Sequence, residues 1–192
     1  MGLYINPGNR GFAEINDADY VDKTMLIEMT NQSIGTRDKL ICVSRPRRFG
    51  KSYAAKMLAA YYDCSCDSHA LFCDKKIAKT DDFEQHINKY NVISLDITGF
   101  ISVARQNGLS LREVPAMIKK AIRKDLVEEG FEPFENDSVS DFLIRCARNS
   151  RRFIFVIDEW DAMIREAKDD EIAQERYLDL LREWCYAGNR NR

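Results

Sequence analysis

A short apolar run, a basic loop and a helical pattern follow one another between residues 40 and 62, and this succession constrains the fold most strongly. The run Leu-Ile-Cys-Val at 40–43 precedes the loop Ser-Arg-Pro-Arg-Arg-Phe-Gly-Lys-Ser at 44–52. Apolar residues at helical spacing come next, from Ala54 to Tyr62. Backbone N–H groups cradle phosphates where a loop of this kind lies between a strand and a helix. The segment therefore predicts a phosphate-binding loop.

A second apolar strand, at residues 153–157, delivers two carboxylates, Asp158 and Glu159, at its C-terminal end. Open α/β sheets bind their ligands beyond the C-terminal ends of their strands, so we expect both segments at one edge of the sheet. Glu159 would point to the opposite face from Asp158 if the strand continued. The sequence Trp-Asp-Ala at 160–162 indicates the start of a helix, and we therefore expect the strand to end at this point.

The expected site gives each residue type a definite role in nucleoside triphosphate chemistry. Gly50 lets the backbone approach the phosphates, and Lys51 places a cation between the β- and γ-phosphates. Ser52 and Asp158 would hold Mg²⁺, and Glu159 would activate the attacking water as a general base. Lys51 and Glu159 are therefore the candidate catalytic residues. The candidate nucleotide-binding residues are Arg47, Arg48, Phe49, Gly50, Lys51, Ser52 and Tyr53.

Strands and helices alternate along the chain. The strands are expected at residues 38–44, 91–97 and 153–157, and the main helices at 22–31, 53–63, 109–129, from 138 or 140 to 149, and 170–186. This order predicts a mostly parallel α/β sheet in a three-layer P-loop NTPase fold. With no internal repeat and no linker, residues 1–192 are expected to form one domain. Asp96, near the end of the second strand, is equally consistent with a third carboxylate of the site and with the cap of a turn.

At three segments the chain resembles the predicted AAA-ATPase-like family of bacterial P-loop ATPases. The segments are Tyr-Val-Asp-Lys-Thr at 20–24, the loop at 44–52 and Ile-Asp-Glu-Trp-Asp at 157–161. The resemblance runs from about Ile5 to the last residues and accounts for Arg45, where the usual loop has a glycine. Trp160 stands where the family usually has Tyr. The resemblance implies ATP as the nucleotide, with Mg²⁺.

Members of this family usually carry a restriction-endonuclease-like nuclease domain after the ATPase domain, and these 192 residues do not contain it. After the last expected helix the sequence shows no further strand pattern. We therefore expect the fold to be truncated before the strand that carries the sensor residue of such ATPases. The function expected is Mg-dependent ATP binding with weak or absent hydrolysis in isolation. The alternative is a short ATPase-like binding or inhibitor protein that engages a protein or a nucleic-acid-processing complex without turnover.

The charge and the apolar runs of the sequence indicate which classes of partner to expect. The net charge is −2 and the sequence pI about 5.8, so no global basic field indicates nucleic acid. A second basic cluster precedes the strand at 153–157, and a solvated helix face is favoured over a nucleic-acid patch there; its members are Arg145, Arg148, Arg151 and Arg152. No apolar run reaches the ~18 residues of a membrane span, and no signal pattern opens the chain. We expect a cytoplasmic protein that binds a nucleotide, with a protein partner or self-association as a further expectation.

Six cysteines raise the question of a zinc site. Cys64 and Cys66 lie near Cys73, with His69 between them. The C-x-C spacing suits a tetrahedral site poorly, and no second pair accompanies it. Free thiols in a reducing compartment are therefore favoured over zinc.

Overall fold

The computed structural model describes all residues except 1, 17–19, 45–48, 133–137, 150 and 188–192. Within that part of the chain, β1 (Asn91–Asp96) and β2 (Phe153–Asp158) form a two-stranded parallel sheet. The register sets Asn91 opposite Phe153 and Asp96 opposite Asp158. The strands expected at 91–97 and 153–157 are thus confirmed within one residue, and the structure makes them parallel neighbours.

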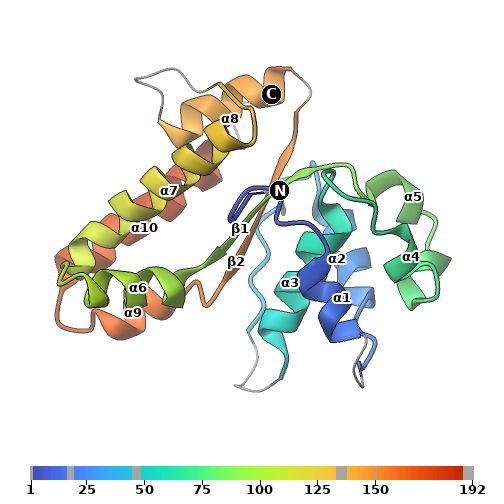
Figure 1. The fold of residues 1–192 in the computed structure, drawn as a ribbon, viewed down its shortest axis with the longest axis horizontal. Helices are drawn as coiled ribbons and strands as arrows, with labels where there is room; N and C mark the ends of the chain where they lie inside the picture. The colour runs from blue at the N-terminus through green and yellow to red at the C-terminus, as the bar shows by residue number, and fades with distance from the viewer. Residues whose placement is uncertain (1, 17–19, 45–48, 133–137, 150, 188–192) are drawn as a thin grey trace.

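Helices lie on both sides of the sheet (Figure 1). One side carries the helices that precede β1 in the chain: α1 (Arg10–Asn16), α2 (Met25–Ser33), α3 (Lys51–Tyr62), α4 (His69–Phe72), η1 (Lys76–Lys79) and α5 (Phe83–His86). The other side carries those that follow it: α6 (Ile97–Gln106), η2 (Leu111–Glu113), α7 (Val114–Glu128), α8 (Val139–Arg148), α9 (Ala162–Glu166) and α10 (Glu171–Ala187). This arrangement is compatible with the α/β class, while the P-loop NTPase assignment stays a prediction.

Two hydrophobic clusters hold these helices against the sheet, one on each face. Val92 and Val156 belong to the cluster with α2 and α3. Ile93 and Leu95 belong to the cluster with the later helices. Successive side chains of a strand point to opposite faces, so each strand contributes to both clusters. Apolar runs without alternation, as in β2, are typical of strands that are covered on both faces.

The outer edge of β1 is covered by the beginning of the chain. The N–H of Ser94 donates to the carbonyl of Tyr4, and Asn6 exchanges two hydrogen bonds with the backbone of Val92, each of these bonds being 2.8 Å long. The buried carboxylate of Asp125 on α7 fixes this segment, because it accepts hydrogen bonds from the N–H groups of Leu3, Tyr4 and Ile5. The edge therefore has partners for its polar groups.

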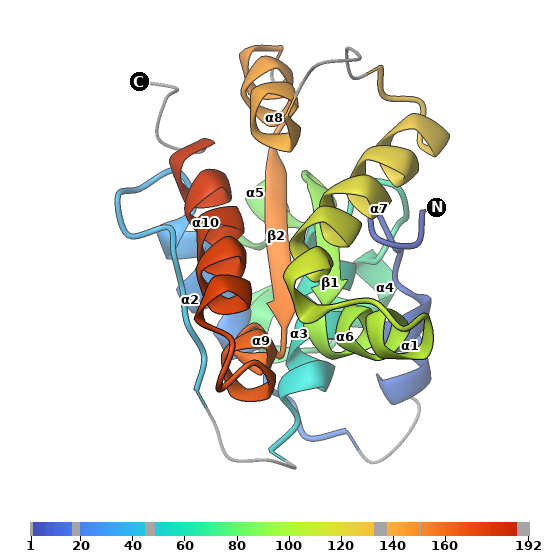
Figure 2. The same cartoon turned by 90° about the vertical axis from the view of Figure 1, so that its left-hand side faces the viewer.

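The outer edge of β2 differs, and here one prediction is wrong. Residues 40–44 are extended beyond β2 on the side away from β1 (Figure 2), yet they do not form the strand expected at 38–44. In the described residues, no backbone hydrogen bond joins 40–44 to β2. Leu40 and Ile41 are exposed as a result, at 66% and 42%. An extended segment without a bonded neighbour is not a strand, whatever its propensity.

Most expected helices are confirmed with shifted ends. The helix expected at 109–129 begins with the 3₁₀ turn η2, which Ser110 and Glu113 cap reciprocally, and continues as α7. The helix expected at 22–31 begins later, at Met25. The short helices α1, α4 and η1 and the helix α6 were not predicted, and α6 starts at Ile97, the last residue of the strand expected at 91–97. In the part of the chain that the structure describes, no helix combines the length and apolar character that a membrane span requires.

Candidate functional site

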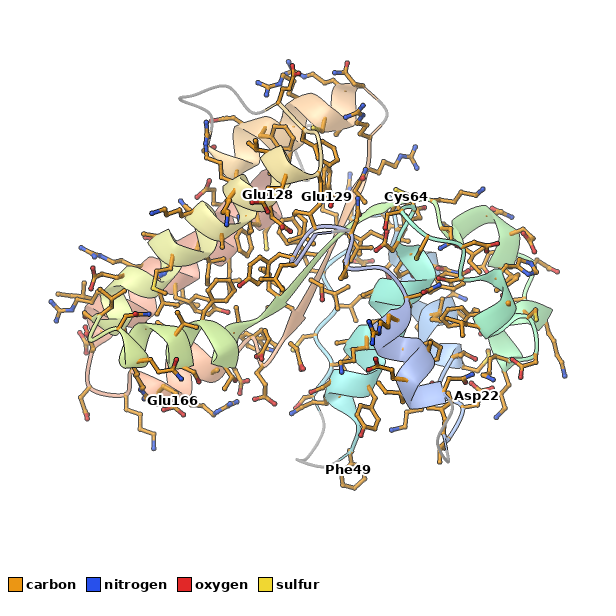
Figure 3. All side chains as sticks on the ribbon, viewed as in Figure 1. Asp22, Phe49, Cys64, Glu128, Glu129 and Glu166 are labelled. Atoms are coloured by element: carbon orange, nitrogen blue, oxygen red, sulfur yellow. The ribbon has the colours of Figure 1, made fainter. Side chains whose placement is uncertain are left out.

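The phosphate-binding segment predicted from the sequence opens helix α3. Gly50 is the N-cap residue, with a left-handed backbone (φ +73°), and Lys51 is the first helical residue. The first turn of α3 carries no acidic residue, so nothing there opposes an anion at the positive end of the helix dipole. Phe49 and Tyr53 flank it with exposed rings, and Phe49 points outward from the end of α3 (Figure 3). Arg47 and Arg48 lie outside the described residues.

The C-terminal end of β2 faces the same side of the molecule as the N-terminal end of α3 (Figure 2). The Nζ of Lys51 lies 4.0 Å from Oε1 of Glu159, and both side chains are largely covered, with exposures of 28% and 29%. The start of α3 and the end of β2, which lie far apart in the sequence, are thus brought together. The structure places the two candidate catalytic residues side by side.

Glu159 turns sharply out of the strand. β2 ends at Asp158, as expected, and Glu159 has φ +49°, which is left-handed and uncommon for a side chain of this size. The following turn is fixed by two hydrogen bonds, from the N–H of Ala162 to the Glu159 carbonyl (2.8 Å) and from the hydroxyl of Tyr177 to the Trp160 carbonyl (2.7 Å). Strained conformations of this kind persist when the surroundings over-determine them, and they cluster at functional sites.

Arg165 on α9 is the second cation at Glu159, and sequence analysis missed it. Its Nη2 donates to Oε2 of Glu159 at 2.7 Å, and its Nη1 pairs with the Asp161 carboxylate. The hydrogen bond from Arg165 holds the pKa of Asp161 below its ordinary value. The same two carboxylates raise the pKa of Arg165 further, with Glu159 as the larger cause. The spacing of Asp161 and Arg165, four residues apart at a helix start, was the available signal.

The candidate magnesium ligands differ in type, which suits the ion. Ser52 provides an exposed hydroxyl at the start of α3, and Asp158 a partly exposed carboxylate that accepts the N–H of Glu159 at 3.0 Å. Mg²⁺ commonly takes one or two protein oxygens together with phosphate oxygens and waters, so this donor set fits it. Among the described residues, no group of three or more His, Cys, Asp and Glu side chains could hold a metal ion.

Asp96 lies opposite Asp158 in the register, but its carboxylate has a local partner. Oδ1 accepts the N–H of Thr98 at 2.9 Å, which caps the start of α6. Of the two alternatives for Asp96, capping is the one that the structure shows, and the capped element is the helix α6 where a turn was considered.

The segment Tyr-Val-Asp-Lys-Thr at 20–24 contacts Phe49 of the predicted phosphate-binding loop, which sequence analysis did not foresee. Lys23 extends from it, and its Nζ donates to the carbonyl of Phe49 at 2.8 Å. Asp22 accepts the N–H and the hydroxyl of Thr24 at 2.8 and 2.7 Å. The only signal for this placement was that these residues belong to the segments that carry the family resemblance.

The basic cluster before β2 and the residues considered for a zinc site include side chains with local partners. Arg145 and Arg151 lie over the rings of Phe142 and Phe131, at 5.6 and 5.3 Å from the ring centres. The Nε2 of His69 lies 2.9 Å from Glu84. All six cysteines are free thiols.

Comparison with known proteins identifies the family. A family described as "Predicted AAA-ATPase" matches residues 8–191, nearly the whole chain. No curated protein and no solved structure matches the chain. The matched range contains the Tyr20–Thr24 segment, the loop at 44–52 and the end of β2, the three segments of the resemblance. The chain therefore belongs to the AAA-ATPase-like family of predicted AAA-ATPases.

Proposed function

We propose that this chain binds Mg·ATP between the start of α3 and the end of β2. The observation that supports this most is the 4.0 Å approach of Lys51 Nζ to Glu159. Lys51 would neutralise the β- and γ-phosphates, beside the backbone of Gly50. Phe49 and Tyr53, with Arg47 and Arg48, would complete the nucleotide contacts. The choice of adenine follows the family.

In this proposal the ion is held by Ser52 and Asp158, and Mg²⁺ would neutralise charge on the phosphates when it is bound. Glu159 would orient and deprotonate the attacking water. Its Oε2 already accepts a hydrogen bond from Arg165 at 2.7 Å, so this oxygen would have to give up that contact in order to hold the water. We therefore propose slow hydrolysis, and this ion pair also favours the alternative of a nucleotide-dependent binding protein without turnover.

The test is the affinity for Mg·ATP of the wild-type chain and of Lys51→Ala, measured by titration calorimetry. We expect the variant to bind at least about tenfold more weakly, which corresponds to ~1.4 kcal/mol. Lys56→Ala is the matched control, because Lys56 is an exposed lysine of the same helix that lies against Gly11 of α1. Equal affinities for wild type and Lys51→Ala would refute the proposed site.

A further inference from the structure

Lys23 is a cation next to the phosphate loop that the proposed function does not use. Its Nζ donates to the Phe49 carbonyl at 2.8 Å, from a segment that precedes the loop by more than twenty residues. A Cβ built on Gly50 would lie 2.7 Å from this Nζ. The lysine tip thus occupies the space in which any other residue at position 50 would place its side chain. Lys23 and Gly50 therefore fit each other as a pair.

The backbone around Lys23 is firmly placed, although the lysine itself is exposed. Thr24 is fully buried, and its hydroxyl accepts the N–H of Ile77 in η1 at 3.2 Å. Asp22 accepts the N–H of Lys76 in the same turn at 3.1 Å. The residues before and after Lys23 are thus both tied to η1, which directs the side chain between them toward the loop.

Tyr20 adds a tie to the helix that follows the loop. Its hydroxyl donates to Sδ of Met57 on α3 at 3.1 Å and accepts the N–H of Lys23 at 3.3 Å. The ring packs edge-on against Phe12 of α1, with ring centres 5.4 Å apart. Residues 20–24 therefore connect α1, α3 and η1 with the loop. All of them except Val21 contact one of these elements or the loop.

The geometry of the Phe49–Gly50 peptide determines how Lys23 affects the N–H of Gly50. In a trans peptide the carbonyl and the N–H point in opposite directions, and the structure has no cis peptide in its described residues. Because Lys23 holds the carbonyl of Phe49, the N–H of Gly50 points away from Lys23. A charge-assisted hydrogen bond on the carbonyl also polarises the amide and strengthens its N–H as a donor.

We propose that Lys23 is a positioning residue of the phosphate loop: it holds the Phe49–Gly50 peptide so that the N–H of Gly50 is presented to the phosphates of the nucleotide. This inference rests on the proposed function for the ligand, and on the Lys23–Phe49 contact for the position. Lys23 acts through the loop backbone, since its Nζ lies on the carbonyl side of the peptide.

The test compares Lys23→Met and Lys23→Arg with wild type, and Lys56→Met is the control for loss of a surface charge beside α3. The first measurement is the Gly50 amide and Phe49 carbonyl resonances in the protein without nucleotide. We expect Lys23→Met to shift both, Lys23→Arg to restore them in part and Lys56→Met to leave them in place. Unchanged resonances in Lys23→Met would overturn the inference, whether or not nucleotide binds.

The second measurement is affinity for Mg·ATP and for inorganic pyrophosphate. We expect Lys23→Met to weaken both about three- to tenfold, a range typical of one charge-assisted hydrogen bond at a partly exposed site. Lys23→Arg should recover most of the loss. If Lys51→Ala abolishes binding while Lys23→Met binds like wild type, the proposed function stands and Lys23 has no positioning role. If wild type binds neither ligand but the Gly50 resonances respond as expected, the proposed function fails and the hold of Lys23 on the loop remains.

Discussion

The carboxylate of Glu159 has two cations beside it, and their distances differ. Arg165 contacts it at 2.7 Å, whereas Lys51 lies at 4.0 Å. In the proposed function Lys51 turns to the phosphates, which leaves Arg165 as the partner of the general base. A general base must reach the attacking water, and the hydrogen bond from Arg165 occupies one of the two oxygens of Glu159. Arg165 therefore restrains hydrolysis in this interpretation.

Replacing Arg165 by Met should raise the steady-state rate of phosphate release about threefold or more, with little change in KM. The wild-type turnover should lie below about 1 s⁻¹, the lower end of the usual range for enzymes. Glu159→Gln should remove the activity in either background. Arg105→Met is the matched control, because Arg105 makes a comparable exposed pair with Glu166 at 2.8 Å. A slower Arg165→Met enzyme would show that Arg165 orients the base.

Asp22 makes the Tyr20–Thr24 segment sensitive to acid. Burial raises the pKa of its carboxyl, but hydrogen bonds from the hydroxyl and N–H of Thr24 and from the N–H of Lys76 outweigh burial, so the pKa lies below the ordinary 3.8. A carboxyl with a lowered pKa stabilises the folded state above its unfolded pKa. The contribution is lost as the pH falls through the folded value.

We therefore expect Asp22→Asn to lower the free energy of unfolding by about 1 kcal/mol at pH 7. The difference from wild type should shrink as the pH is reduced through 3.8 and below, because the unfolded chain then binds a proton at Asp22 before the folded protein does. Urea unfolding across this range measures it, with Asp81→Asn as the control at an exposed position. A difference that stays constant down to pH 3 would contradict this explanation.

The two strands of the sheet differ in how their outer edges are satisfied. β1 bonds to residues 4–6, whereas β2 has no bonded neighbour on its outer side in the described residues. The N–H of Asn91 donates to the Arg152 carbonyl, and the parallel pattern alternates from there. The N–H groups of Ile154 and Val156 therefore face β1, and those of Phe153, Phe155 and Ile157 face outward.

Amide exchange should therefore alternate along β2. We expect the amides of Phe153, Phe155 and Ile157 to exchange much faster than those of Ile154 and Val156, because the outward set has no acceptor within the sheet. Residues 40–43 should exchange rapidly as well. Uniform protection along β2 in a monomer, confirmed by light scattering, would mean that another segment completes this edge. Exposed edges pair readily with other chains, so the monomer must be verified in the same sample.

Sequence reasoning located the residues that chemistry makes distinctive. Gly50, Lys51 and Glu159 could be predicted as neighbours because a helix start and a strand end are recognisable from periodicity and composition. Residues 40–43 show the limit: the propensity of Leu, Ile, Cys and Val favours a strand, but strand formation needs a bonded neighbour elsewhere in the chain. The role of Lys23 depends on a contact with a distant segment, which a single sequence does not display, and that of Arg165 on the turn at Glu159, for which the spacing to Asp161 was the only signal. α6 was missed because Thr98 and Gly99 suggest a turn.

At the scale of the whole molecule, the segments of the proposed site lie at one end of the sheet. Helices cover both faces of a parallel pair of strands, and the strand ends and the start of α3 share one side of the molecule (Figures 1 and 2). The proposed nucleotide lies where these meet, with ligands drawn from both segments. The proposal thus requires Ser52 and Asp158 to serve the same metal ion.

Paramagnetic broadening by Mn²⁺ in place of Mg²⁺ tests this requirement directly. In the presence of ATP, the amide resonances of residues 50–53 and of Asp158 and Glu159 should broaden together, at concentrations where Mn²⁺ without ATP leaves them sharp. Lys51→Ala should reduce both effects in parallel, because the metal is brought by the nucleotide. Broadening of only one of the two segments, or of neither, would contradict a shared Mg·ATP site between α3 and β2.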